Sequence, residues 1–384
     1  MKKKYYLIGV AILLGGILCL FLRGGHGKKA MTGDNLPVET KGSTRKPFSL
    51  SAVISSIGLD PEEREIERDP HMSRQEKDEQ RKWYRVHRDG ADIKLTFHVT
   101  DSMGQDVPDA TVEAGFFKND DRKGETDENG LFTAEGKTWG ELTCFVKKDG
   151  HYDTRVVCHF DSEDDDVKNG KWVPLHRTIE VTLKEKRNPI PMYVKQIGIR
   201  VPKKGEAVGV DLKVGDLVSP HGKGEYAHIM LKCWGDKPIP LTLAVSRYLT
   251  LSLDNEGEGF IRGGKDLQSA FYSLHEAPEN GYEQAISFCY RRTNDKVLEE
   301  GELPKSEYLI FRTQVEPGKD GEIEKAHYGK IYSMWFDISA NDREGAAISL
   351  TYYLNPTPND RNLEFDPDKN LFEERKRGGV VLTP

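Results

Sequence analysis

The feature that most constrains the fold is a regular succession of short strand-like runs that begins after residue 90. Residues 92–99 read DIKLTFHV, in which apolar and polar side chains alternate. Similar runs follow at intervals of about ten residues, and Gly, Pro, Asn and Asp separate them. A period of two places successive side chains on opposite faces of a strand, and short turns join antiparallel neighbours. We therefore expect an antiparallel β-sandwich within residues 91–187.

The second half of the chain continues this pattern with longer runs. Residues 188–355 include YAHIMLKCW and GKIYSMWFDI, which are rich in β-branched and aromatic residues. We expect a larger antiparallel β domain of the sandwich or jelly-roll type, so the chain is predicted to be all-β beyond its N-terminal part. The stretch around Pro189 and Pro191 is typical of an interdomain linker, and residues 356–384 are predicted to form an extended C-terminal arm.

An apolar segment predicts a membrane helix over residues 1–23. Lysines occupy positions 2–4, an uncharged run covers residues 5–22, and Arg23 ends it. A helix of this length spans about 27 Å, close to the ~30 Å hydrocarbon core of a bilayer. We favour an uncleaved signal anchor, because no small-residue cleavage site follows the run. A cleaved signal peptide and a lipoprotein processed at Cys19 stay open as alternatives.

Residues 24–90 are predicted to form a polar stalk with short charged helices. Two helix starts are marked by capping residues, namely Asp60, Pro61 and Glu63 for the first, and Ser73 with Glu76 for the second. Residues 81–88, RKWYRVHR, interleave basic and aromatic side chains, a pattern that can bind phosphate backbones or lipid head groups. Their acidic neighbours favour a solvated helix end that leads into the first strand.

Composition narrows the class of protein. Hydrophobic residues make up 36% and charged residues 31% of the 384-residue chain, and its mean hydropathy is -0.64, so most of the chain is expected to be water-soluble. The net charge of -7 gives no general attraction to nucleic acid, and we expect no nucleic-acid partner.

Three stretches of the first predicted sandwich resemble a known module. VTDSMGQDVPDATV at 99–112, GETDENGLFTAEGKTWGELTCFVKKDGHYD at 124–153 and the closing IEVTLK are similar to the carboxypeptidase regulatory-like domain, a transthyretin-like or prealbumin-like β-sandwich of bacterial surface proteins. The matching positions are Val99, Asp101, Gly104, Val107, Pro108, Ala110, Val112, Gly124, Thr126, Asp127, Gly130, Phe132, Gly150 and Tyr152. His151 interrupts the Gly-Tyr pair of that module.

The resemblance covers residues 92–184, about a quarter of the chain. It implies a β-sandwich and no catalysis, since the module lacks the zinc peptidase machinery. The overall plan resembles that of uncharacterised envelope proteins of Gram-negative bacteria.

Cysteine usage permits disulfides without requiring them. Cys144 and Cys158 flank a turn segment and have the same parity, so in a hairpin they could face each other within disulfide reach. Two buried free thiols are the alternative. Cys233 and Cys289 complete an even number outside the apolar segment.

Known catalytic motifs are absent from the sequence. It contains no His-Glu-x-x-His, Gly-x-Ser-x-Gly, Cys-x-x-Cys or Gly-x-Gly-x-x-Gly pattern, and no phosphate-binding loop of the form Gly-x-x-x-x-Gly-Lys-Ser/Thr. We therefore assign no catalytic, cofactor-binding or metal-binding residue and expect no cofactor. A site assembled from distant residues stays open, because a glycosidase needs only two suitably placed carboxylates.

Four segments have a functional interpretation beside a plain one. The acidic residues 161–166 could bind Ca²⁺ or form a solvated loop. Residues 216–228, with Gly222, Lys223 and Gly224 between His221 and His228, could form an anion nest or a plain loop. Asp360, Arg361, Glu364 and Asp366 could dock a partner or pin the arm to the β domain through ion pairs. Asp120, Asp121, Asp127 and Glu128 could bind Ca²⁺, although Asp127 and Gly130 are typical of a hairpin turn.

These patterns predict a non-catalytic, membrane-anchored envelope protein with β-sandwich modules for binding or structural interaction. We expect a single-pass protein of the bacterial inner membrane, with its water-soluble part in the periplasm or outside the cell and an envelope protein or glycan as partner. The alternative is an envelope hydrolase acting on glycan or peptide, with residues 91–187 as an accessory domain. Two facing carboxylates, or a His beside a nucleophile, in a deep cleft of residues 188–384 would favour the enzyme.

Overall fold

The computed structural model describes most of the chain beyond residue 59. The described residues are 60–160, 165–235, 245–293, 296–299, 301–319, 322–338, 346–372 and 384. The chain divides into Met1–Asp60 and Pro61–Pro384, and the description below concerns the second unit. The predicted membrane helix over residues 1–23 and much of the predicted stalk lie outside the described residues. Within the described ranges, no helix is both long and apolar enough to cross a membrane.

Within the described residues, two helices precede the first strand, as the capping residues predict. They are α3 (Pro61–Arg68) and α4 (Arg74–Asp89). The capping box at α4 is confirmed, since Ser73 Oγ accepts from the Glu76 amide at 3.3 Å and the Ser73 amide donates to the Glu76 carboxylate at 2.8 Å. Arg85 of α4 pairs with the buried Glu63 of α3 at 2.6 Å, which ties the two helices together.

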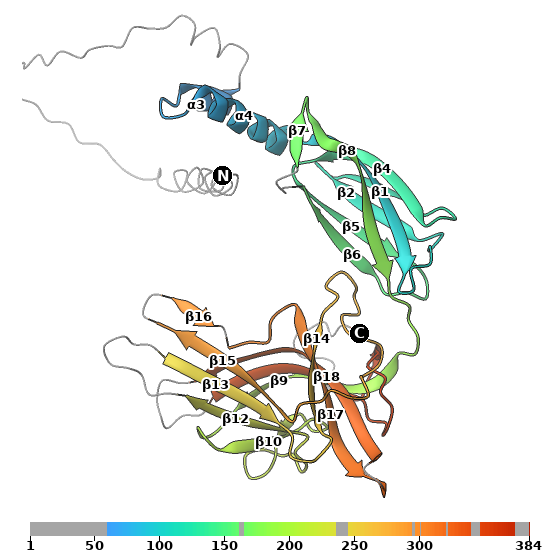
Figure 1. Cartoon of the computed structure of the whole chain (residues 1–384), viewed down its shortest axis with the longest axis vertical. Coiled ribbons are helices and arrows are strands. Elements are labelled where there is room, and N and C mark those ends of the chain that lie inside the picture. Colours follow the sequence, from blue (N-terminus) through green and yellow to red (C-terminus); the bar gives the residue numbers. More distant parts are fainter. Residues whose placement is uncertain are drawn as a thin grey trace, which may run out of the picture. The chain divides into compact units, whose positions relative to one another are not determined.

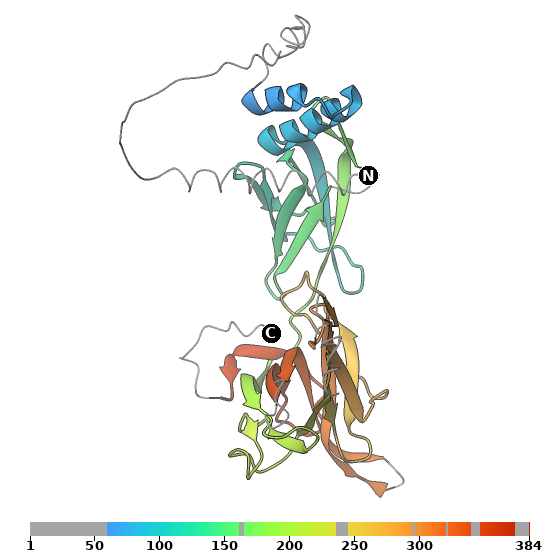
Figure 2. The ribbon, with the colours of Figure 1, turned by 90° about the vertical axis from the view of Figure 1, so that its left-hand side faces the viewer.

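The helices lie at one end of the first sandwich (Figure 2). The ring of Trp83 packs against Trp172 at 6.0 Å, and Lys82 pairs with Asp166 at 2.8 Å. The basic and aromatic side chains of residues 81–88 therefore help to dock α4 on the sandwich.

Residues 91–183 form a β-sandwich of two four-stranded sheets (Figure 1). Its strands are β1 (Ala91–Asp101), β2 (Thr111–Phe116), β3 (Asp120–Glu125), β4 (Leu131–Thr138), β5 (Glu141–Lys147), β6 (Thr154–His159), β7 (Asp166–Lys168) and β8 (Lys171–Leu183). The sheet orders are β4-β1-β8-β7 and β3-β2-β5-β6. The predicted sandwich is confirmed, with one difference: β1 and β8, its first and longest strands, pair in parallel. Because the other sheet intervenes in the chain, no tight turn has to join these two strands.

Strict alternation builds the core of this sandwich. Ile93, Leu95, Phe97 and Val99 of β1 point inward, and the residues between them are only partly buried. Trp172 fills the end of the core nearest the helices and is fully buried.

Residues 190–370 form a second, larger sandwich of two six-stranded sheets. One sheet has the order β11-β10-β12-β13-β15-β16 and the other β14-β17-β18-β19-β9-β20. The strands are β9 (Ile190–Arg200), β10 (Ala207–Asp211), β11 (Asp216–Leu217), β12 (Ile229–Gly235), β13 (Val245–Ser252), β14 (Gly259–Gly264), β15 (Ala285–Arg292), β16 (Val297–Glu299), β17 (Glu307–Pro317), β18 (Ile323–Ile338), β19 (Ala346–Leu354) and β20 (Phe365–Asn370).

The second of these sheets is covered on both faces. One face packs on the partner sheet through residues such as Leu309, Phe311 and Ile348. The other face carries Tyr308, Tyr332 and Tyr353, and irregular segments at 265–284 and 355–364 lie over it, contributing Ala277 and Leu363 to the same cluster. This doubly covered sheet positions the candidate site.

The described part of the predicted C-terminal arm belongs to the second sandwich. Phe365–Asn370 form β20, which lies parallel to β9 at the edge of the sheet. Leu363, Glu364 and Phe365 are each buried, because the segment before β20 closes over the sheet. β9 begins at Ile190, so only a short connection joins the two sandwiches.

Candidate functional site

The connection between the two sandwiches is organised around one buried carboxylate. Glu364 accepts hydrogen bonds from the amides of Arg187 at 2.9 Å and Asn188 at 2.6 Å, and from the hydroxyl of Tyr152 at 2.8 Å. Only 1% of Glu364 is exposed, so these three donors replace the water that its charge would otherwise need. The pKa of Tyr152 is raised, mainly by burial and secondly by the hydrogen bond to Glu364.

An irregular segment of the second sandwich reinforces this connection. Main-chain hydrogen bonds run from the Arg155 amide to the Gln268 carbonyl at 2.7 Å and from the Ala270 amide to the Asp153 carbonyl at 2.8 Å. The ring of Phe271 stacks on Tyr152 at 4.9 Å. The connection therefore combines a strand-like ladder, a ring stack and a buried carboxylate.

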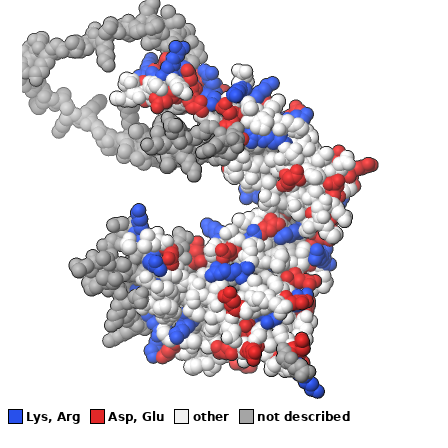
Figure 3. Space-filling model, in the orientation of Figure 1, with Lys and Arg blue, Asp and Glu red and all other residues white. Residues whose placement is uncertain are grey.

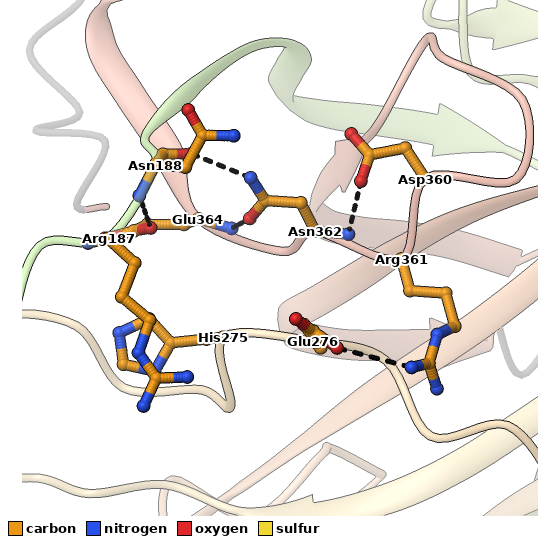
Figure 4. A pocket seen from close by; sticks show the side chains of 8 residues that line it. All are labelled: Arg187, Asn188, His275, Glu276, Asp360, Arg361, Asn362 and Glu364. Atoms are coloured by element: carbon orange, nitrogen blue, oxygen red, sulfur yellow. Dashed lines mark hydrogen bonds and ion pairs between the residues drawn. The ribbon is translucent and has the colours of Figure 1, made fainter.

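Beside this connection lies a polar pocket of about 260 Å³. It is lined by Arg187, Asn188, His275, Glu276, Asp360, Arg361, Asn362 and Glu364 (Figure 4). Three segments that are distant in sequence supply these residues: the connection, the loop between β14 and β15, and the segment before β20. Every lining side chain is polar or charged, whereas most small-molecule pockets have largely apolar walls.

The carboxylates of the pocket are already engaged. Glu276 pairs with Arg361 at 3.3 Å, and Asp360 accepts from the Asn355 side chain at 3.0 Å and the Asn362 amide at 3.1 Å. Arg361 also pairs with Glu279 at 3.3 Å. Arg361 therefore pins this segment to the β domain through ion pairs, and of its two partners Glu276 also lines the pocket.

Some hydrogen-bond donors and acceptors near the connection have no partner among the described residues. The guanidinium of Arg187 and the side-chain amide of Asn188 are exposed and make no hydrogen bond with any described residue. His275 Nε2 lies 2.8 Å from the Glu185 carbonyl, which can only accept, so this nitrogen carries the proton and Nδ1 is the acceptor. Burial lowers the pKa of His275, and the charge of Arg187 acts in the same direction. Figure 4 shows Arg187 and His275 on one side of the pocket, and Arg361 with Glu276 on the other.

A second polar cluster, which sequence analysis did not single out, lies under the same loop. Lys330 of β18 is fully buried, and its Nζ donates to Tyr332 Oη at 2.7 Å and to Ser273 Oγ at 3.1 Å. The rings of Phe271, Tyr332 and Tyr353 lie 4.4–4.8 Å from Nζ. Burial lowers the pKa of Lys330 well below its ordinary value. A serine and a lysine of lowered pKa are within hydrogen-bond reach, but neither lines the pocket, and only 2% of Ser273 is exposed.

In the loop at 216–228, for which an anion nest and a plain loop were both considered, main-chain amides bond to carboxylates of the protein itself. Asp211 accepts from the amides of Lys213, Glu225 and Tyr226, and Asp216 accepts from those of Leu217 and Lys223. The glycines of this loop give these two carboxylates room, since a Cβ at Gly224 would lie 2.5 Å from that of Asp211. The loop therefore satisfies internal carboxylates with the amides that were proposed for an external anion.

The segments considered for Ca²⁺ have other partners or lie partly outside the described residues. In the acidic run, 161–164 fall outside them, Asp165 pairs with Arg177 at 2.5 Å and Asp166 pairs with Lys82. Asp120 pairs with Arg122, and Asp127 closes a turn by accepting from the amides of Asn129 and Leu131. Gly130 has the positive φ of 68° predicted for the turn. Across the described ranges, no three His, Cys, Asp or Glu side chains converge on a common point suited to a metal ion.

The four cysteines of the described residues are free thiols. β5 and β6 form the predicted hairpin, but its register pairs Cys144 with Val156 and Leu142 with Cys158. The two cysteines do not face each other but are diagonal neighbours on the buried face, so the alternative of two buried free thiols is confirmed. The long turn between the strands sets this register.

Comparisons with known proteins concern the fold. No protein-family model and no curated protein matches the chain. Among solved structures, 3-chlorocatechol 1,2-dioxygenase from Rhodococcus opacus 1CP is 14% identical with a TM-score of 0.21, over 25% of this chain and 61% of that one. BcpA, the major pilin subunit of Bacillus cereus, is 13% identical with a TM-score of 0.20, over 68% of each chain. A streptococcal ancillary pilin is 13% identical with a TM-score of 0.18, over 58% of this chain and 53% of that one.

The chain thus spans less than two thirds of the length of this dioxygenase.

Proposed function

We propose that this chain is a non-catalytic envelope protein, held in the bacterial inner membrane by residues 1–23, whose two sandwiches act as a binding or structural unit outside the cytoplasm. The apolar run at 5–22 supports the anchor. The motif match over residues 92–184 supports assigning the first sandwich to the carboxypeptidase regulatory-like class of surface modules. The partner is an envelope protein or a glycan.

The observation that carries the non-catalytic part of the proposal is the state of the pocket carboxylates. A general acid or base has to exchange a proton with its substrate, so it cannot be fully committed to fixed donors. Glu364 is buried under three such donors, and Glu276 and Asp360 bond to side chains and amides of the fold. This pattern favours binding over hydrolysis.

The proposal also rests on how the sandwiches are joined. A flexible linker would let each module act separately, whereas the bonds to Glu364 and the ladder at Arg155 and Ala270 couple them. A coupled pair of sandwiches suits a protein that transmits load or presents a surface at a set distance from the membrane.

A topology experiment tests the location. A reporter enzyme that is active only outside the cytoplasm is fused after residue 384, and a matched fusion lacks residues 1–23. We expect activity from the full fusion, retention of the full-length protein in carbonate-washed membranes, and loss of both from the truncated fusion. Reporter activity confined to the cytoplasm would overturn the proposed location. Release of a shortened protein from the membrane would favour the cleaved signal peptide instead.

A further inference from the structure

We infer that the polar pocket beside Arg187 binds a neutral, polyhydroxylated ligand, namely one saccharide unit of a glycan. This inference deepens the proposed function, because it chooses the glycan over the envelope protein as the partner. It rests on the composition, charge and open hydrogen-bonding groups of the eight lining residues.

The walls exclude an apolar ligand. All eight lining residues present polar or charged side chains, and an apolar group placed against them would leave these groups without water or partners. A ligand that displaces water from such walls has to supply hydrogen bonds over most of its own surface. A ring that carries several hydroxyl groups meets this requirement.

The charges disfavour an ionic ligand. The lining includes two arginines, Arg187 and Arg361, and three carboxylates. Burial lowers the pKa of His275, which favours its neutral form. Arg361 pairs with Glu276, and the remaining charges are those of Arg187, Asp360 and Glu364, so the net charge of the lining residues is small. The pocket therefore exerts no strong electrostatic attraction on a cation or an anion.

The open groups offer both donors and acceptors. Arg187 presents a fork of N–H donors, and the amide of Asn188 both donates and accepts. His275 Nδ1 adds an acceptor. A sugar hydroxyl donates one hydrogen bond and accepts others, so hydroxyls of one ring can bond to Arg187 and His275, which lie on the same side of the pocket (Figure 4). The volume of about 260 Å³ suits a single ring, and the half-open shape lets the rest of a chain leave the pocket.

Ligand titration of the full-length protein in detergent tests the inference. N-acetylglucosamine, glucose and galactose serve as neutral probes, with glucuronate and choline as charged comparators, and binding is followed by saturation-transfer NMR and calorimetry. We expect at least one neutral sugar to bind with a Kd on the order of 1 mM, as befits a single ring. Arg187→Ala should weaken that binding at least tenfold, and Asn188→Ala should weaken it as well.

The substitution at Arg187 is suited to this test because its main-chain bond to Glu364 is retained. Arg200→Ala is the matched control, since Arg200 is an exposed arginine of the same sandwich outside the pocket. Failure of all three neutral sugars to bind, binding of glucuronate or choline alone, or unchanged sugar binding in Arg187→Ala would each overturn the inference. None of these outcomes bears on the topology experiment, so the two proposals fail separately.

Discussion

The hydroxyl of Tyr152, in the first sandwich, donates a hydrogen bond of 2.8 Å to Glu364, which precedes the last strand of the second. Glu364 is buried, so water cannot replace a hydrogen-bond donor that it loses. Each lost donor should therefore lower the free energy of unfolding. The pair therefore couples the stability of the two sandwiches, and its energetic contribution can be measured.

We expect Tyr152→Phe to lower the free energy of unfolding by about 1.5–3 kcal/mol, the range for a hydrogen bond to a charged group. The ring of residue 152 can still stack on Phe271, so the loss reports the hydroxyl. Urea denaturation measures the change. Tyr226→Phe is the control, because Tyr226 is 40% exposed and its hydroxyl bonds to no described residue. Equal unfolding midpoints for Tyr152→Phe and the wild type would contradict the role given to this pair.

The burial of Lys330 should affect how the stability of the protein depends on pH. Its folded pKa lies below the unfolded value of about 10.4, because burial disfavours the charged form. Between these two values the unfolded chain binds a proton that the folded chain does not, so Lys330 contributes stability that grows with pH. The buried thiols of Cys158 and Cys233 contribute the opposite trend, because their folded pKa is raised. We expect Lys330→Met to remove the contribution of Lys330, so that its unfolding midpoint falls relative to that of the wild type between pH 8 and about 9.5, and to unfold no more easily at pH 7, since an apolar side chain avoids the cost of burying an amine.

Urea midpoints across this pH range provide the measurement. Lys232→Met is the matched control, because Lys232 is exposed on β12. The account of Lys330 fails if the midpoint of Lys330→Met follows pH as steeply as that of the wild type.

The strands were predictable because the pattern that specifies each one lies within a short stretch of sequence. Ile93, Leu95 and Phe97 alternate with polar residues, and this pattern alone places them in a core. The helix start at Ser73 was predictable for the same reason, since a capping box involves only four positions. The register of Cys144 and Cys158 was not, because parity fixes the face of a strand but leaves shifts by two residues open.

The candidate site could be predicted only in part. The polar residues from Asp360 to Glu364 stood out, but their partners Arg187 and His275 come from segments that no local motif connects. Lys330 carried a weak signal, since it falls in phase with Tyr328 and Tyr332 of β18, and residues 326–332 of that strand are all buried. A lysine at such a position usually marks a solvent-facing side, and only the covering loop with Phe271 and Ser273 reverses that expectation.

The thiols of the described residues should stay reduced even in an oxidising compartment. Cys144 and Cys158 are diagonal neighbours across β5 and β6, and Cβ atoms in this relationship are about 7 Å apart, beyond the ~4 Å of a disulfide. Burial raises the pKa of Cys158 to about 11 and that of Cys233 to about 12, so little reactive thiolate forms.

In a Cys19→Ser background, we expect a maleimide to reach the half-buried Cys289 first and the other three thiols only after unfolding. Mass spectrometry of unreduced peptides provides the control for oxidation. A peptide linking Cys144 to Cys158 would contradict the register.

The loop at 216–228, whose amides bond to Asp216, should be destabilised by a side chain at Gly222. A Cβ there would lie 2.3 Å from the Leu217 carbonyl oxygen and 2.8 Å from Asp216 Oδ1, and the carbonyl belongs to a main chain that cannot move aside cheaply. We expect Gly222→Ala to cost about 1–3 kcal/mol in urea denaturation, the usual range for forced overpacking. Gly198→Ala is the matched control, because nothing lies within 4 Å of a Cβ at that exposed strand position. If both variants unfold at the wild-type midpoint, Asp216 does not hold the loop in this arrangement, and the amides at Leu217 and Lys223 would be free for an external anion after all.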